Sequence, residues 1–396
     1  ADDGTRTSFG NVFDYWEDPV TTIHEQLMFL LAEIELPDRA HDLALKRYQD
    51  LGEWFSRPQS RLVDFDAHIF VQGSFAFGTA IRPLNPDDEY DLDFTCKLRA
   101  CVSRTTHTQE QLKELVGAEL AAYRVARNIL TPLRPKNRCW RLKYRDQIPF
   151  HLDVVPAIRA DDARRAELGA LMETRGIDSI LARQLASRAL WITDQRDRNF
   201  KQISPAWPSS NPGGYGLWFL TRLQPRPLGK LLLAEAQVDP APIFRDKAPL
   251  QQATQLLKRH RDVMFSTKDD AKPVSIIITT IAGHAVQPGD TLVQCLERTL
   301  TALEQVRLSN TDEILNPVNP NENFADRWQR ADCQRLNLKV NFHNWIMQAR
   351  RDFAELLAGP SLRRFIEMTE DVWQVSLPEA VKQRLGVAVA APSVIR

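Results

Sequence analysis

Tyr90-Asp-Leu-Asp-Phe-Thr95 alternates polar with apolar side chains, as a half-buried β-strand does. Residues two positions apart on a strand share a face, so Asp91 and Asp93 point to one side while Leu92 packs behind them. Residues 87–93 include five acidic side chains and no basic one, and such crowding is unfavourable unless a cation lies within it. Hard divalent ions such as Mg²⁺ take oxygen ligands of this kind. The strand is therefore a candidate metal site, whereas residues 87–89 are more typical of a solvated turn.

A glycine-serine turn precedes this strand. The β-branched and aromatic run from His68 to Gln72 predicts a short strand, and Gly73-Ser74 follows it directly. Glycine lets the backbone approach a phosphate closely, and the amides that open the next helix point toward the anion. Ser74 can donate a hydroxyl hydrogen bond to the same group. We interpret these residues as a phosphate-binding element, with an ordinary turn as the alternative.

A third aspartate follows on another predicted strand. Asp153 lies between Leu152 and Val154 within the apolar run 150–155, and a carboxylate is costly to bury there without a partner. A structural aspartate is the alternative to a metal or hydrogen-bonded site. Together with Asp91 and Asp93, it can hold two Mg²⁺ (or Mn²⁺) ions about 4 Å apart for an in-line phosphoryl displacement. In this hypothesis Asp153 serves the metal that activates an attacking ribose hydroxyl, and the glycine-serine turn holds the pyrophosphate that leaves.

Composition restricts the class of partner. The 396 residues carry 51 Lys and Arg against 51 Asp and Glu, which argues against a surface built mainly to hold a nucleic-acid backbone. The five cysteines are scattered and form no C-x-x-C pair, which predicts neither a disulfide framework nor a zinc site. The first residues lack the basic-then-apolar pattern of a signal peptide, and no run approaches the roughly 18 apolar residues that span a bilayer. We therefore expect small-molecule partners, no membrane association and a cytoplasmic location.

Periodicity predicts an α+β protein. Helical spacing of apolar residues covers two N-terminal stretches, 23–34 and 45–55, which we expect to pack on a sheet. A further helix over 108–129 and a strand over 140–144 complete the first half. Residues 159–215 look irregular and charged, and the pattern beyond them is mostly helical.

The motifs resemble those of a known superfamily. Gly-Ser followed by Asp-x-Asp and a later Asp is similar to the signature of the polymerase β-like nucleotidyltransferases. The longer stretches resemble the CD-NTases, the bacterial relatives of cyclic GMP–AMP synthase and the DncV-like enzymes of anti-phage signalling. Those that carry this likeness are Gln72–Pro83, Asp91–Asp93 and His151–Pro156.

The likeness continues into the C-terminal half. Residues 256–261 are similar to the family helix whose lysine reaches the triphosphate, which implies that role for Lys258. Residues 273–280 resemble the segment whose serine also contacts phosphate, which implies the same for Ser275. Residues 316–328 resemble a further family stretch, so the similarity spans roughly residues 60–345.

The resemblance implies a bilobal fold with the active site in the cleft. It consists of a polymerase β-like nucleotidyltransferase core, with a mixed sheet flanked by helices, and a helical C-terminal lobe. We expect the core and its N-terminal scaffold helices over 1–215, the helical domain over 216–385 and a flexible tail over 386–396. The implied activity is Mg²⁺-dependent condensation of nucleoside triphosphates, ATP among them, into a cyclic di- or trinucleotide second messenger. The implied partners are a downstream effector and accessory proteins of an anti-phage (CBASS) system.

Two departures from the family pattern affect these expectations. Cyclic GMP–AMP synthase has a base-stacking aromatic residue after the phosphate-contacting serine, but this chain has Ile276, so stacking must come from elsewhere, with Tyr215, Trp218 and Phe219 as candidates. The animal enzyme also carries a His/Cys zinc insertion for DNA sensing. This chain has no cysteine cluster, so zinc-dependent DNA sensing is not expected. We interpret the histidines as structural or solvated; they are His68, His151, His260 and His284.

Two other functions fit part of the pattern. One is a nucleotidyltransferase that adds nucleotides to an RNA end or a small acceptor, which the neutral charge disfavours. The other is a non-catalytic nucleotide-binding regulatory module, which the presence of all three aspartates disfavours.

Overall fold

The structure is a computed structural model that describes residues 22–145, 148–223 and 246–378. The tail expected over 386–396 lies outside the described residues. Within those residues no helix is long and apolar enough to cross a membrane.

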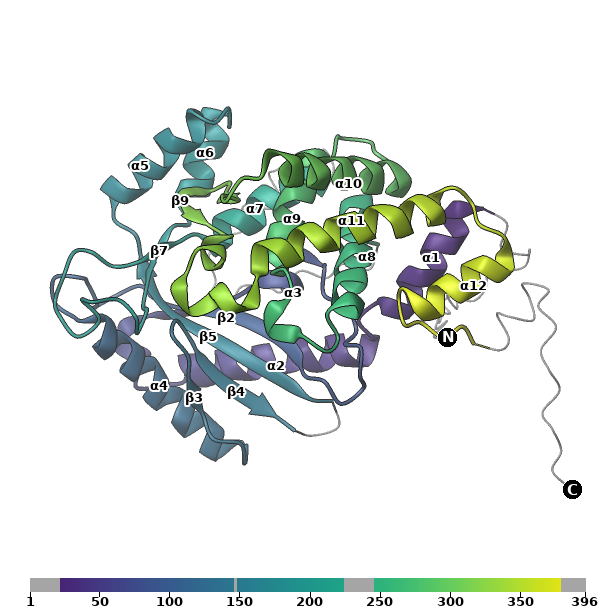
Figure 1. Cartoon of the computed structure of the whole chain (residues 1–396). Helices are drawn as coiled ribbons and strands as arrows, with labels where there is room; N and C mark the ends of the chain where they lie inside the picture. The colour runs from purple at the N-terminus through teal and green to yellow at the C-terminus, as the bar shows by residue number, and fades with distance from the viewer. Residues whose placement is uncertain (1–21, 146–147, 224–245, 379–396) are drawn as a thin grey trace, which may run out of the picture.

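A mixed sheet forms the centre of the first half of the chain (Figure 1). Its main path runs in the order β1-β2-β5-β4-β3, and β6 and β7 extend it from the far end of β5. Strands β2 and β5 are parallel, and the other pairs are antiparallel. The strands are β1 (Ala67–Gln72), β2 (Tyr90–Leu98), β3 (Arg134–Pro135), β4 (Trp140–Tyr144), β5 (Phe150–Arg159), β6 (Leu190–Ile192) and β7 (Ser209–Ser210).

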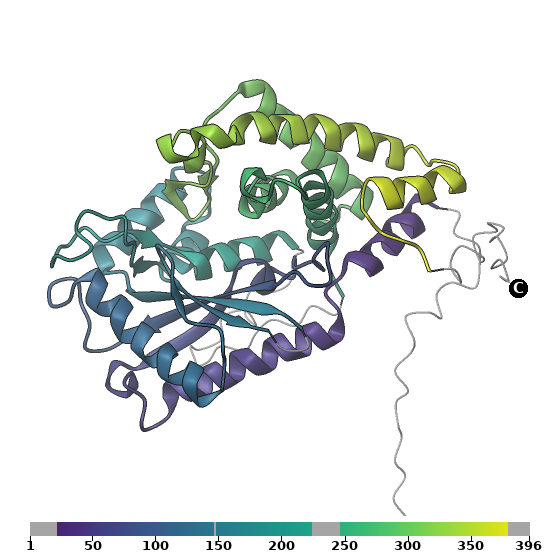
Figure 2. The ribbon, with the colours of Figure 1, turned by 60° about the horizontal axis from the view of Figure 1, so that its bottom comes forward.

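One face of the sheet packs against α2 (Asp38–Ser56) and α4 (Gln109–Ala126), which lie below it in Figure 2. Side chains along β2 point alternately to the two faces of the sheet, which explains which of them lie against α2 and α4. Leu92 and Phe94 are almost fully buried in the core that these two helices share with the sheet, so the aspartates between them face the opposite side. On that side lie α3 (Gly73–Phe77) and α7 (Pro212–Leu223).

A second hydrophobic core lies in the helical half of the molecule. It is built from α8 (Pro249–Met264), α9 (Ser275–Ala285), α10 (Leu292–Ser309), α11 (Leu338–Leu357) and α12 (Leu362–Asp371). Helix α1 (Ile23–Ile34) packs into this second core beside α8. The expectation that both N-terminal helices pack on the sheet is therefore wrong for α1 and right for α2. The chain passes from one core to the other at Pro37, which precedes α2.

Residues 159–215 are more regular than the sequence predicted. They contain the contacting helices α5 (Asp162–Glu173) and α6 (Ser179–Ala186) as well as β6 and β7. Aspartates cap both helices, because Asp161 accepts from the amide of Arg164 and Asp178 from those of Ile180 and Leu181. The charged residues that suggested irregular structure thus include helix caps. The remaining elements are the hairpin β8 (Leu315–Asn316) and β9 (Asn319–Asn323) and short 3-10 turns at Val63–Phe65, Asp269–Ala271, Asp326–Trp328 and Ala331–Leu336.

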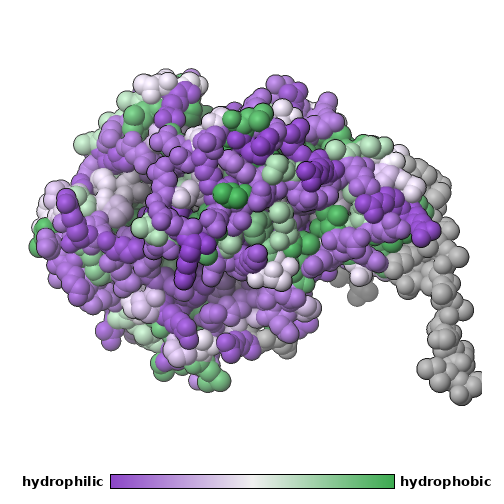
Figure 3. Space-filling model, viewed as in Figure 1, coloured by the Kyte–Doolittle hydropathy of each residue, from purple (hydrophilic) through white to green (hydrophobic). Residues whose placement is uncertain are grey.

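The surface of the molecule is largely polar in the view of Figure 3, with apolar side chains scattered among hydrophilic ones. Such scattered apolar groups are normal for a folded protein.

Candidate active site

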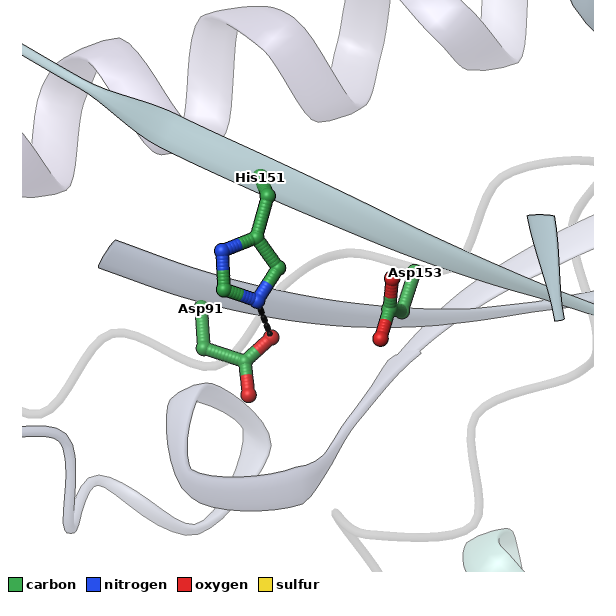
Figure 4. A group of neighbouring side chains, drawn as sticks. All are labelled: Asp91, His151 and Asp153. Carbon is green, nitrogen blue, oxygen red and sulfur yellow. Dashed lines mark ion pairs between the residues drawn. The ribbon is translucent and has the colours of Figure 1, made fainter. Parts of the chain in front are cut away.

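The three aspartates meet on the face of the parallel pair β2 and β5 that is turned away from α2 and α4. Asp93 lies directly opposite Asp153 in the strand register, and Asp91 lies opposite His151. Asp91, His151 and Asp153 each offer a ligand atom, and these atoms lie within 4.8 Å of one another (Figure 4). The predicted arrangement, with two carboxylates on one strand and a third on its neighbour, is present.

The glycine-serine turn is built around Asp93. Gly73 has φ +65°, and a Cβ atom on it would overlap the Oδ2 atom of Asp93. Glycine is needed there for two separate reasons, because the left-handed backbone disfavours other residues and the carboxylate occupies the space of a side chain. Gln72 ends β1 opposite Asp93 in the register. The turn that we expect to hold phosphate therefore lies against one of the aspartates.

A chain of polar contacts holds Asp91. The Nε2 atom of His151 lies 2.8 Å from Asp91 Oδ1, and Nδ1 of the same ring lies 3.1 Å from Glu89 Oε2. Lys143 completes the chain, with Nζ 2.8 Å from Glu89 Oε2. Glu89 is thus not part of a solvated turn. His151 is not solvated either, and its two contacts agree with the structural role that we expected for it. Its place two residues before Asp153 on a strand was the signal in the sequence, since it puts both side chains on one face.

Arg141, on the adjacent strand β4, forms an ion pair with Asp153. Its Nε and Nη2 atoms donate to Oδ1 and Oδ2 of Asp153 at 2.7 and 2.6 Å. Such a bidentate pair fixes the plane of the carboxylate. No pattern in the sequence selects Arg141, because its position depends on the register between β4 and β5.

The electrostatics of the site fit a bound cation. Burial, Asp91 and Asp153 together raise the pKa of Asp93 well above its usual value. Burial opposes the ionisation of Asp91, but His151, Arg141 and Lys258 hold the pKa of that carboxyl below its usual value. A divalent cation among the three carboxylates would relieve the repulsion that Asp93 experiences, and oxygen ligands are those that Mg²⁺ prefers.

Helix α8 binds the backbone that follows α3. Its side chains one and two turns apart share a face, and four of them reach carbonyl oxygens in residues 77–82. Together these bonds fix the loop that follows the glycine-serine turn. The bonds run from Gln251 Nε2 to Phe77 (2.8 Å), from Gln255 Nε2 to Ala80 (2.8 Å), from Lys258 Nζ to Thr79 (2.7 Å) and from Arg259 Nη1 to Arg82 (3.3 Å).

Lys258 is therefore buried at the edge of the site rather than exposed. Burial lowers its pKa to about 7, with Arg261 acting in the same direction. Ser275 opens α9 and accepts a hydrogen bond of 2.7 Å from Arg261 Nη1. Arg261 thus lies between the two residues for which the family likeness implied phosphate contacts.

Lys258→Met is expected to weaken triphosphate binding more than it slows turnover. A lysine with a pKa of about 7 is charged below neutral pH, and a triphosphate beside it would favour the charged form. The lost contact is worth about 1.5–3 kcal/mol, which appears mainly in KM. We further expect wild-type affinity to fall as the pH rises through neutrality and the affinity of the variant to stay flat. Initial rates at several pH values measure both, and Lys268→Met, outside this cluster, is the control. An unchanged KM would contradict the assignment.

The aromatic residues considered for base stacking do not serve that purpose. Tyr215, Trp218 and Phe219 are 2%, 0% and 0% exposed, and they pack with Phe77 and with one another in the core. Their helical spacing on α7 was a signal of burial. A ligand base cannot reach them.

Comparison with known proteins agrees with this geometry. Residues 67–156 match the nucleotidyltransferase domain of the cyclic GMP-AMP synthase DncV-like family. The chain is 29% identical over 286 residues to the c-di-GMP synthase of Roseivirga ehrenbergii, which covers 71% of this chain and 66% of that protein. It is 25% identical over 400 residues to the cyclic dinucleotide synthase CdnG of Bradyrhizobium diazoefficiens, covering 94% and 87%. The chain thus spans just under two thirds of the first relative and most of the second.

The solved structure of Bradyrhizobium diazoefficiens CdnG in complex with GTP has the same fold. It superposes with a TM-score of 0.65 at 22% identity, covering 92% of this chain and 98% of that one. The chain has a mixed sheet that carries an aspartate pair beside a third aspartate, and a helical lobe lies next to this sheet. This combination defines a nucleotidyltransferase with the polymerase β-like fold. Within that class, the matched domain and the two curated relatives indicate a CD-NTase.

Proposed function

We propose that this enzyme condenses nucleoside triphosphates into a cyclic di- or trinucleotide second messenger. The observation that carries the proposal is the register that sets Asp93 beside Asp153 and Asp91 beside His151, next to the Gly73 turn. The relatives that are cyclic dinucleotide synthases favour a ring as the product. ATP is among the substrates that we expect.

In this proposal Asp91, Asp93 and Asp153 hold two Mg²⁺ ions, with Mn²⁺ as a substitute. Bound metal would neutralise phosphate charge and lower the pKa of the attacking ribose hydroxyl. Gly73 and Ser74 bind the β- and γ-phosphates, and Lys258 and Ser275 support the same group. The ribose oxygen forms a bond to the α-phosphorus, the bond between that phosphorus and the β-bridging oxygen breaks, and pyrophosphate leaves. A second such transfer closes the ring.

The residues around the aspartates position the reacting groups. Arg141 holds both oxygens of Asp153, so this carboxylate is fixed where it can accept the proton of the hydroxyl. His151 and Glu89 orient Asp91 from the side away from the turn. Catalysis then rests on positioning and on electrostatic stabilisation of the transferred phosphoryl group.

Incubation with labelled ATP, GTP, CTP and UTP tests the proposal. With Mg²⁺ we expect a phosphatase-resistant product whose mass is that of two or three nucleoside monophosphates less one water for each linkage. EDTA should prevent its formation. Elongation of an added RNA oligonucleotide without cyclic product would instead indicate an RNA-modifying enzyme. Retention of nucleotide without turnover would indicate a binding module.

We also propose that the product acts on a downstream effector in anti-phage defence, as the family likeness implies. Co-expression with genes that adjoin its own, followed by phage challenge of wild type and Asp93→Asn, checks this role. Protection by the wild type alone is the expected result, and equal protection by both would contradict it.

A further inference from the structure

A pocket lies on the same face of the sheet as the aspartates. It is a cavity of about 200 Å³. Asp93 and Lys97 are four residues apart on β2, roughly 13 Å along the strand, and the residues between them alternate without a bulge. The pocket therefore lies at the opposite end of β1, β2 and β5 from the aspartates.

Four strands, the turn after α6 and the first turn of α7 enclose the cavity. His68 on β1 is directly opposite Lys97 on β2 in the register, and Phe70 follows on the same face as His68. Arg159 ends β5 opposite Leu190 of β6. Leu190 and Phe70 belong to a small apolar cluster of their own, which gives the cavity a partly apolar floor. Arg188, from the turn between α6 and β6, completes the lining together with Gly213 in the first turn of α7.

The lining is basic. It carries Lys97, Arg159 and Arg188 as well as the imidazole of His68, and no aspartate or glutamate of the described chain is among its residues. Lys97 and His68 are only 6% and 1% exposed, and each has an interaction partner of its own, so the two arginines are the groups on which the proposal below depends. Within the described residues, neither arginine has a carboxylate oxygen within 4.0 Å.

We propose that this pocket binds a small multivalent oxyanion of the phosphate or pyrophosphate class. The cations that converge on one cavity favour a group with more than one negative charge. Guanidinium groups donate in a planar fork that matches phosphate oxygens. Pockets for drug-sized ligands are about 300–1,000 Å³, so this cavity suits one or two phosphoryl groups rather than a whole nucleotide. Free phosphate and the pyrophosphate released by nucleotide transfer are the two sources of this chemistry.

Calorimetric titration of the full-length protein with pyrophosphate in EDTA tests the site without any turnover. Wild type should bind, and Arg159→Gln with Arg188→Gln should weaken binding about tenfold or more. Both arginines lie at the surface and outside the catalytic machinery, so synthesis by this variant in the absence of added anion should be unchanged. Arg175→Gln with Arg183→Gln removes the same charge from exposed positions outside the pocket, and it should bind like wild type.

The double variant Ser74→Ala with Lys258→Met distinguishes pyrophosphate binding in the pocket from binding in the active site. This variant should keep the pyrophosphate affinity of wild type if the anion occupies the new pocket. The proposal is overturned if wild type binds no pyrophosphate, or if binding is lost in this variant and kept in the arginine pair. A parallel titration with phosphate identifies the source, because tighter binding of pyrophosphate indicates the product of the reaction and equal or tighter binding of phosphate indicates the free ion. Because the assay needs no catalysis, its outcome is independent of the proposed nucleotide synthesis.

Discussion

Asp93→Asn is expected to abolish nucleotide transfer while making the metal-free protein more stable at neutral pH. Loss of a metal ligand removes several kcal/mol of transition-state stabilisation, or about 10³-fold or more in rate. Stability should change in the opposite direction, because burial, Asp91 and Asp153 raise the pKa of Asp93. The folded protein thus binds this proton more tightly than the unfolded chain does. The stabilisation is complete below the usual aspartate pKa and is lost as the pH rises through the raised pKa.

Thermal melting in EDTA across the acid-to-neutral range measures this effect. The melting temperature of wild type should fall toward neutral pH and rise again when Mg²⁺ is added. Asp93→Asn lacks the carboxylate, so position 93 should contribute neither change in this variant. Asp87→Asn removes an exposed charge from the preceding loop and should behave like wild type in rate and in melting. A variant that makes product at the wild-type rate would remove Asp93 from the site. An Asp93→Asn variant that melts well below wild type in EDTA would show that the charge of Asp93 is already compensated in the wild-type protein.

Gly73→Ala is expected to lower turnover by about two orders of magnitude or more, in line with the cost of a small misplacement of reacting groups. A left-handed backbone costs an alanine about 1–2 kcal/mol, and the new methyl group would also push the Asp93 carboxylate from its place. The rate should therefore fall far more than the stability.

Gly176→Ala is the matched control for this variant. Gly176 has φ +82°, and a Cβ atom on it would meet no atom of a more distant residue within 4 Å. An alanine there carries the same backbone strain without the contact. Both variants should lose similar stability, and only Gly73→Ala should lose activity. Comparable activity in the two, measured as initial rates at saturating triphosphate, would mean that the contact with Asp93 has no catalytic role.

The local pattern of the strands was enough to predict which residues of the aspartate cluster share a strand face. Alternation along β2 placed Asp91 and Asp93 on one face, and the apolar run around Asp153 identified a second strand of the same kind. The phosphate-binding role of the turn stays a prediction, but its position beside Asp93 agrees with it. The face that each side chain occupies depends on residues within a few positions of one another, and a sequence states such relations directly. The meeting of Asp93 with Asp153 depends on the pairing of β2 with β5, and the likeness to a known family supported that part of the prediction.

The partners of the aspartates could not be predicted in the same way. Arg141 meets Asp153 only because β4 pairs with β5 in one register, and a shift by one residue would turn it to the other face. The aromatic residues of α7 were misjudged for a related reason, since their burial depends on contacts with α3 and α9. Likewise, the spacing of apolar residues in α1 predicts an amphipathic helix but does not indicate which of the two cores it packs into.

The bonds from α8 to the loop after α3 bear on how this enzyme can be divided. Four carbonyl groups, from the last residue of α3 and the loop after it, accept hydrogen bonds from a helix 174–179 residues further along the chain. The stretch 67–156 that matches the DncV-like domain is therefore not a module that can be excised or grafted with its geometry intact. A shortened protein that kept the three aspartates would still have to replace that helix, and chimaeras between relatives should exchange the loop and the helix as one unit.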